Sequence, residues 1–170
     1  MYLDKSYILA EIKDSLADEI ISWCYDNIDN SYLYEEEPYY GIVHDVHVTL
    51  LSDISDKNTK NIQKTIEEES PFTCYLGQLK LFLTNSKFDV LYIPIINQEI
   101  CNINKNLSNY IQYNKFYAEY VPHVTLCYLK KGFGESFLGN RYFCDKSFDV
   151  DELIYSGPDT KMIFRLGKKL

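Results

Sequence analysis

"HVTL" occurs twice in the 170-residue sequence, at positions 47–50 and 123–126. The two copies contain two of the three histidines of the chain. Each copy lies in a run of apolar and β-branched residues, "VHVTLL" and "HVTLCYL", which is typical of a β-strand. The sequence therefore predicts a repeated supersecondary unit, with one copy in each half of the chain.

Alternation along a strand places the histidine and the threonine of each copy on the same face. His47 and Thr49 project together, roughly 6.6 Å apart, and so do His123 and Thr125. The valine and leucine of each copy point the other way, into a core. If the two halves pack about a pseudo-twofold axis, we expect two imidazoles and two hydroxyls to face one cleft.

This set of side chains suits the cleavage of a phosphodiester bond. A neutral histidine can take a proton from the attacking oxygen, and a protonated one can give a proton to the leaving oxygen. Imidazole serves in both roles because its pKa lies near neutrality. The threonine hydroxyls can donate hydrogen bonds to the non-bridging oxygens as charge builds there.

Two other interpretations of the motifs are open. In the first, the histidines and threonines are ordinary strand residues whose hydroxyls bond a neighbouring backbone. In the second, the histidines bind a metal, but two histidines without clustered carboxylates or cysteines make a poor ligand set. The five cysteines form no C-x-x-C pair. We predict no metal and no cofactor.

The other elements are expected to follow a similar order in the two halves. The first half is expected to contain a strand at 6–12, a helix at 14–28 capped by Asp14 or Ser15, a long loop at 29–45, a strand at 46–51 and a polar surface helix at 56–70. The second is expected to contain strands at 72–83 and 89–96 joined by a turn, a helix at 97–112, a strand at 123–129, a glycine-containing loop at 130–143 and strands at 149–156 and 161–166.

The paired H-x-T motifs resemble those of the 2H phosphoesterase superfamily. That family includes 2′-5′ RNA ligase-like proteins, cyclic phosphodiesterases and phage enzymes that cut cyclic oligonucleotide signals. The similarity extends to "YGIVHDVHVTLL", "YVPHVTLCYLKKG" and "FDVDELIYSG". It implies a metal-independent reaction in which His47 and His123 are the acid and the base, and Thr49 and Thr125 bind phosphate. It does not say which histidine is which.

The resemblance also implies an α+β fold of two pseudo-symmetric lobes of antiparallel sheet, with helices outside and a central cleft. We expect a single bilobal domain over residues 1–170, with lobe one at about 1–70 and lobe two at about 71–170. The sequence does not decide whether the terminal strands are exchanged between the two lobes. We expect a monomer.

Charge and composition narrow the substrate. The formal net charge of −8 argues against a protein that coats duplex DNA, because such binding needs Lys and Arg to displace counterions. A small cyclic nucleotide or short oligonucleotide in a locally positive pocket fits better. The many Asn, Ile, Lys and Tyr residues are those of an AT-rich genome, as in many phages. This favours a phage enzyme that destroys a cyclic-nucleotide signal of bacterial anti-phage (anti-CBASS) immunity.

Candidate substrate-binding residues lie outside the motifs. Tyr39 and Tyr40, in a loop that also holds Tyr32 and Tyr34, can stack on bases. Three cations near the second motif can make the cleft positive. These are Lys130, Lys131 and Arg141. For the tyrosines the alternative is that Tyr is simply common throughout this chain, at 16 of 170 residues. For the three cations the alternative, and for His44 our interpretation, is a solvated loop position.

Other functions remain open at this point. One is a 2′,3′-cyclic phosphodiesterase or 2′-5′ RNA ligase-like enzyme acting on RNA ends. A second is a module that sequesters nucleotides without cutting them, and a third is a purely structural protein with accidental motifs. The first residues do not form a signal peptide and the apolar runs are short, so we expect no membrane association and a cytoplasmic protein, in the host cytosol if phage-encoded.

Overall fold

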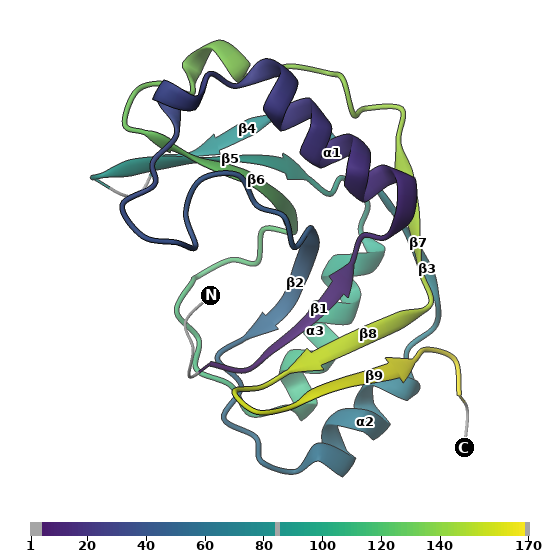
Figure 1. Ribbon diagram of the computed structural model, residues 1–170. Helices are drawn as coiled ribbons and strands as arrows, with labels where there is room; N and C mark the ends of the chain where they lie inside the picture. The colour runs from purple at the N-terminus through teal and green to yellow at the C-terminus, as the bar shows by residue number, and fades with distance from the viewer. Residues whose placement is uncertain (1–4, 84–85, 169–170) are drawn as a thin grey trace.

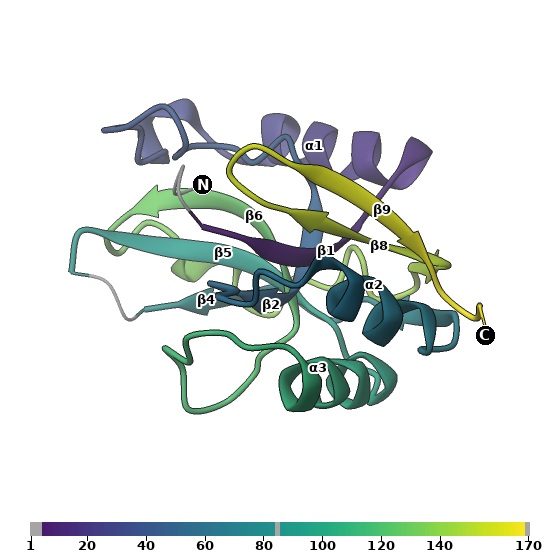
Figure 2. The same cartoon turned by 90° about the horizontal axis from the view of Figure 1, so that it is seen from below.

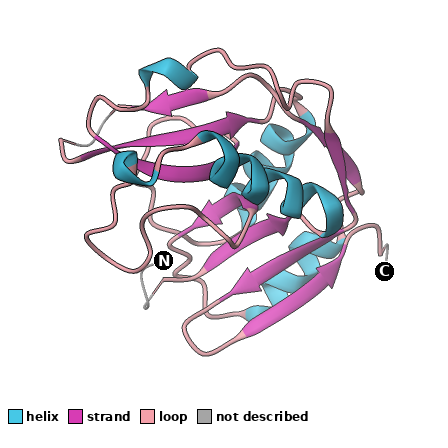
Figure 3. Ribbon diagram, turned by 45° about the horizontal axis from the view of Figure 1, so that its top comes forward, coloured by secondary structure: helices cyan, strands magenta, loops and turns pink. Residues whose placement is uncertain are grey.

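The computed structural model describes residues 5–83 and 86–168, which form antiparallel sheet with three α-helices around it (Figure 3). The helices are α1 (Asp14–Asn27), α2 (Thr59–Glu67) and α3 (Glu99–Tyr110). The strands are β1 (Tyr7–Glu11), β2 (His47–Ser52), β3 (Phe72–Tyr75), β4 (Lys80–Phe82), β5 (Phe88–Pro94), β6 (His123–Lys130), β7 (Ser147–Val150), β8 (Glu152–Ser156) and β9 (Lys161–Arg165). Helix and strand content of this kind is the expected α+β class.

The two HVTL strands lie side by side in the middle of the main sheet. Its seven strands run in the order β4-β5-β6-β2-β1-β8-β9, and β3 and β7 pair separately. Strands β4 to β6 come from the second half of the chain and lie on one side of the β2–β6 junction. The C-terminal strands β8 and β9 lie on the other side, beside the N-terminal strand β1.

Helix α1 packs on one face of the strands, and α2 and α3 pack on the opposite face (Figure 1, Figure 2). Helix α1 lies across β4, β5 and β6, whereas α2 and α3 lie behind β1, β2, β8 and β9 (Figure 1). Figure 2 shows them on either side of the strands. Trp23 of α1 packs edge-on against Phe143, with ring centroids 5.6 Å apart. The Asn104 side chain of α3 donates a hydrogen bond to the Leu50 carbonyl of β2 (2.6 Å).

Helix α2 confirms the predicted helix, and its apolar side is more deeply buried than a surface helix requires. Ile62 and Ile66 are fully buried, while the remaining positions of the helix are largely charged or polar. Isoleucines four residues apart share one helical face, so this face packs on the sheet.

No helix in the described part of the chain is long and apolar enough to cross a membrane.

Two predicted strands are each divided between the two sheets. The segment 72–83 forms β3 and β4, and the segment 149–156 forms β7 and β8. Between β3 and β4 the backbone passes so close to its neighbour that a Cβ on Gly77 would lie 2.7 Å from the Ile96 side chain. A glycine inside a strand pattern often marks such a close approach. Of the turn predicted between β4 and β5, residues 84 and 85 lie outside the described residues.

The predicted cap of α1 was wrong. Lys13, in extended conformation, occupies the N-cap position and makes no capping hydrogen bond, because a lysine side chain has no acceptor for the helix N–H groups; it pairs with Glu152. Asp14 is the first helical residue and has φ +57, a conformation that Asp tolerates better than most residues. The chain therefore turns from β1 into the helix without the expected side-chain cap.

The predicted loop at 29–45 follows β6 instead of standing apart from it. Leu33 and Ile42 form isolated bridges with Leu129 and Cys127. These positions lie beyond Val124, the β6 residue that pairs with β2. Strand β2 begins at His47, so beyond Val124 the loop that precedes β2 pairs with β6. The Val43 N–H donates to the Leu126 carbonyl, and the Tyr128 N–H donates to the Gly41 carbonyl.

Candidate active site

The two HVTL strands meet at one pair of residues. Val48 lies opposite Val124, and both are fully buried. Because side chains alternate along a strand, the residues flanking each valine project from the other face of the sheet. These four residues, all partly exposed, are His47, Thr49, His123 and Thr125. The fold therefore brings all four predicted catalytic residues to one face.

Both strands also carry a β-bulge at the leucine of the motif. The pairing of β2 with β1 shifts register at Leu50, and the pairing of β6 with β5 shifts register at Leu126. A bulge bends its strand and re-aims neighbouring side chains, and bulges are frequent next to active sites. The internal repeat thus extends from the sequence to an irregularity of the backbone.

Each motif histidine is fixed by the carbonyl two residues before it. His47 Nδ1 lies 2.6 Å from the Asp45 carbonyl oxygen, and His123 Nδ1 lies 2.7 Å from that of Val121. A carbonyl can only accept, so Nδ1 carries the hydrogen and donates. In the neutral ring Nε2 is then the unprotonated nitrogen, which can take a proton from another group.

Aromatic rings surround His123. The Phe82 ring meets the His123 ring edge-on, with centroids 4.9 Å apart, and Tyr92 does the same at 5.4 Å. Phe82 and Tyr92 are themselves stacked, at 3.9 Å and 15°. Burial lowers the pKa of His123, the hydrogen bond to the Val121 carbonyl opposes this effect, and the positive charge of His47 lowers the pKa further. The surroundings of His123 therefore favour its neutral form.

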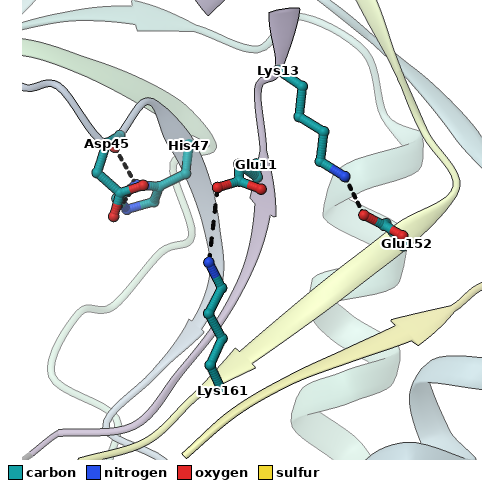
Figure 4. Close-up of polar contacts among 6 residues, drawn as sticks. All are labelled: Glu11, Lys13, Asp45, His47, Glu152 and Lys161. Carbon is teal, nitrogen blue, oxygen red and sulfur yellow. Dashed lines mark hydrogen bonds and ion pairs between the residues drawn. The ribbon is translucent and has the colours of Figure 1, made fainter.

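Charged groups surround His47 instead (Figure 4). Glu11 lies opposite His47 in the pairing of β1 with β2. An Asp45 carboxylate oxygen lies 4.0 Å from His47 Nδ1, and Lys161 Nζ lies 3.9 Å from the Glu11 carboxylate. The same cross-strand position beside His123 holds Pro94. The backbone repeat is therefore symmetric, whereas its electrostatic surroundings are not.

A tyrosine ties the two motifs together. Tyr120, three residues before His123 in the sequence, donates a hydrogen bond from its hydroxyl to the Thr49 carbonyl (2.9 Å). Burial raises the pKa of this hydroxyl, so it stays protonated and donates. The segment that leads into the second motif is thus attached to the backbone of the first.

The loop at 29–45, here called the tyrosine loop, lies on the face of β5 and β6 that also carries His123. Tyr40 packs against Tyr128 (4.9 Å) and Phe88 (5.0 Å), and Tyr39 packs on Tyr40 (4.5 Å). The register places Phe88 and Tyr128 on the same face as His123. Tyr39 stays about half exposed. A role in substrate binding for Tyr39 and Tyr40 stays a prediction.

The three predicted cations have different neighbours. Lys130 donates to the Ser31 carbonyl (2.7 Å) in the tyrosine loop. Lys131 pairs with the buried carboxylate of Asp89 (2.7 Å), so its charge is already compensated. Arg141 is exposed beside Tyr142, whose hydroxyl donates to Glu19 of α1. Substrate binding by these cations also stays a prediction.

His44, expected to be a solvated loop residue, is exposed, and its Nε2 lies 2.8 Å from the Tyr25 hydroxyl.

Across residues 5–83 and 86–168, no three His, Cys, Asp or Glu side chains are grouped so that they could hold a metal ion. Metal independence itself remains a prediction about the reaction.

Four residues of the site were not found from the sequence. They are Glu11, Phe82, Tyr92 and Tyr120. The strand patterns alone could have placed Tyr92 and Phe82 on a face, but only the pairing of β5 with β6 and of β4 with β5 turns that face toward His123. Glu11 needed the register of β1 with β2, and Tyr120 lies in an irregular segment.

Comparison with known sequences identifies no relative. No protein-family model matches the chain, and no curated protein sequence matches it. Comparison with solved structures does find similar folds, at sequence identities of 10–16%.

Three of these structures illustrate the likeness. Escherichia coli LigT in complex with 3′-AMP is 15% identical, with a TM-score of 0.63, over 96% of this chain and 94% of that one. Kluyveromyces marxianus Usb1 with uridine monophosphate is 11% identical, with a TM-score of 0.61, over 98% and 100%. The protein TT0787 of Thermus thermophilus is 11% identical, with a TM-score of 0.66, over 97% and 100%. The α+β fold that the family resemblance implies is therefore confirmed, and it is similar to the folds of LigT, Usb1 and TT0787.

Proposed function

We propose that this protein is a metal-independent phosphodiesterase that cleaves small cyclic nucleotides by acid–base catalysis with two histidines. The observation that carries the proposal is the matched pair of imidazoles at the β2–β6 junction. Each is held through Nδ1, so each can present Nε2 to a substrate. The similar folds of a protein described as a phosphoesterase and of LigT solved with phosphate support a phosphoesterase.

The surroundings of the two imidazoles suggest how they divide the work. His123, whose pKa burial lowers, is neutral and takes the proton from the attacking oxygen at Nε2. The phosphorus–oxygen bond to the leaving group breaks as the new one forms. His47, with Glu11 opposite it and an Asp45 carboxylate oxygen 4.0 Å from its Nδ1, is the acid that delivers a proton to the leaving oxygen. Negative groups suit the cationic imidazole, and an aromatic pocket suits the neutral one.

The two threonines bind the phosphate group of the substrate. Thr49 and Thr125 lie on the same face as the histidines, so their hydroxyls can donate to the non-bridging phosphate oxygens. Charge on these oxygens grows in the transition state, and donors already in position stabilise it.

The size of the substrate follows from charge. A formal net charge of −8 repels a long polyanion, whereas a small nucleotide needs only a local site. LigT and Usb1 have been solved with 3′-AMP and uridine monophosphate, which are ligands of this size. Within this class we propose cyclic oligonucleotides that act as signals in bacterial anti-phage immunity. The composition typical of an AT-rich genome supports a phage origin and a place of action in the host cytosol.

The test is incubation with a panel of cyclic oligonucleotides, 2′,3′-cyclic mononucleotides and short RNA ends in EDTA, with products identified by mass spectrometry. We expect linear products from the cyclic oligonucleotides. Opening of the 2′,3′-cyclic mononucleotides alone would favour the enzyme of RNA ends. Nucleotide binding without any product would establish a sequestering module. Activity that disappears in EDTA and returns with a divalent ion would contradict metal independence.

A further inference from the structure

An aromatic surface lies beside His123, and the proposed reaction assigns no part of the substrate to it. In the main sheet, Tyr92 lies opposite Thr125, and Lys80 lies opposite Tyr92. Phe82 is two residues beyond Lys80 on the same strand, so its side chain projects from the same face. Phe82 and Tyr92 therefore share the face of the catalytic residues.

The two rings differ in how they are covered. Tyr92 is almost completely buried, and one face of its ring is stacked on Phe82 at 3.9 Å. Phe82 is only half-buried, and it belongs to β4, the edge strand of the main sheet. Tyr92 thus supports Phe82 from one side, while the other side of the Phe82 ring is not covered by a further strand of this sheet.

The position of Phe82 relative to His123 suits a nucleotide. The Phe82 and His123 rings are in edge contact, with centroids 4.9 Å apart. A phosphate bonded to His123 Nε2 is separated from its base by a single ribose, so the base of that nucleotide falls beside the phosphate site. Every base has a flat π-face, and stacking on an aromatic side chain is tolerant of base identity.

On the His47 side of the junction, the two positions that correspond to Tyr92 and its β4 neighbour hold no aromatic ring. The residue opposite Thr49, at the position that corresponds to Tyr92, is Leu9, and its neighbour on β8 is Ile154. Both are aliphatic and buried. A base is therefore better accommodated on the His123 side of the junction than on the His47 side.

We propose that Phe82, supported by Tyr92, is a stacking site for a nucleobase of the substrate, next to the phosphate held at His123. The inference rests on the proposed function for the identity of the substrate as a nucleotide. It deepens that function by adding a binding position: the site binds a base on the His123 side of the scissile phosphate. It does not discriminate among the four bases.

The test measures binding, so it does not depend on turnover. The dissociation constants of 3′-AMP and of its abasic analogue, 1-deoxyribose 3-phosphate, are measured by calorimetry for the wild type and for Phe82→Leu and Phe82→Trp. Phe133→Leu is the matched control, because Phe133 is a partly exposed aromatic residue that packs on Tyr32, outside the site.

We expect Phe82→Leu to weaken binding of 3′-AMP by about 5- to 150-fold and to leave binding of the abasic phosphate unchanged. Phe82→Trp and Phe133→Leu should bind 3′-AMP as the wild type does. An equal loss for both ligands would overturn the proposal, because Phe82 would then only shape the pocket of His123. An unchanged affinity for 3′-AMP would overturn it as well.

A second measurement uses the wild type alone, in case Phe82→Leu does not fold. Stacking on Phe82 predicts upfield ring-current shifts of the adenine H2 and H8 protons of bound 3′-AMP, with Overhauser contacts to the Phe82 ring. Their absence in a saturated complex would contradict the proposal. Failure of the proposed function would show separately, as bound nucleotide that is never cleaved.

Discussion

Val48 lies directly opposite Val124, which places the centre of the internal repeat between two corresponding residues of the two motifs. The two motifs have the same backbone features: both have the bulge at the leucine and the hydrogen bond from histidine Nδ1 to the carbonyl two residues before it. The repeat ends at the neighbouring strands, which supply Glu11 on one side and Pro94 on the other. Two equivalent imidazoles therefore have different surroundings, and variants of the two should behave differently.

Removal of either imidazole should abolish most of the turnover. General acid or base catalysis contributes about 10²–10⁴-fold, so His47→Ala and His123→Ala should each lower kcat by that factor. Both side chains are only partly buried, so circular dichroism should show a folded protein. His44→Ala is the control, because His44 is exposed and bonds Tyr25 instead of the motifs. A double variant that keeps more than a tenth of the activity would contradict the mechanism.

A substrate with an activated leaving group should separate the acid from the base. A p-nitrophenyl phosphodiester of a nucleotide releases an anion that needs no proton. We expect His47→Ala to regain most of the wild-type rate on this substrate, and His123→Ala to stay inactive, because the attacking oxygen still needs a base. The ratio of kcat between activated and natural substrates measures the effect. Recovery in His123→Ala alone would reverse the two assignments.

Loss of the hydrogen bond from Tyr120 should destabilise the fold. Tyr120→Phe leaves the Thr49 carbonyl without its side-chain donor, and a typical internal hydrogen bond contributes about 1 kcal/mol. We expect the free energy of unfolding to fall by about this amount and the urea midpoint to fall with it. Tyr117→Phe is the matched control, since Tyr117 lies in the same segment and is 76% exposed. Equal midpoints for the two variants would show that the tether contributes no stability.

The sequence was sufficient for the features that depend on local pattern. Alternation in the HVTL strands predicted which residues share a face, and the valines are indeed buried. The sequence could not predict that 72–83 and 149–156 would each divide between two sheets, because the division depends on the pairing of β3 with β7, which are more than 70 residues apart in the chain. Glu11 and Phe82 escaped notice for a related reason. Their place beside the histidines is set by strand register, which involves residues far apart in the chain.

The pH dependence tests the surroundings of His123. Its pKa is lowered, chiefly by burial, from the ordinary value of about 6.5. Since the chain has three histidines, NMR titration should resolve three curves, which His44→Asn and His47→Asn assign. We expect the His123 midpoint below 6.5 and the acid limb of kcat/KM at the same place, since this limb reports loss of the neutral base in the free enzyme. The two motif histidines interact, so the measured midpoints belong to the coupled pair.

The same shift carries a consequence for stability. Between the folded pKa of His123 and about 6.5, the unfolded chain binds more protons than the folded one, so the free energy of unfolding rises with pH across this window. The contribution of His123 is fully present above about 6.5 and is lost as the pH falls toward the folded pKa. His123→Asn should lack this slope while keeping the slopes from other groups. Urea unfolding of both proteins through this window measures the difference. Parallel stability curves, or an NMR midpoint at or above about 6.5, would contradict a neutral His123 and with it the assignment of His123 as the base.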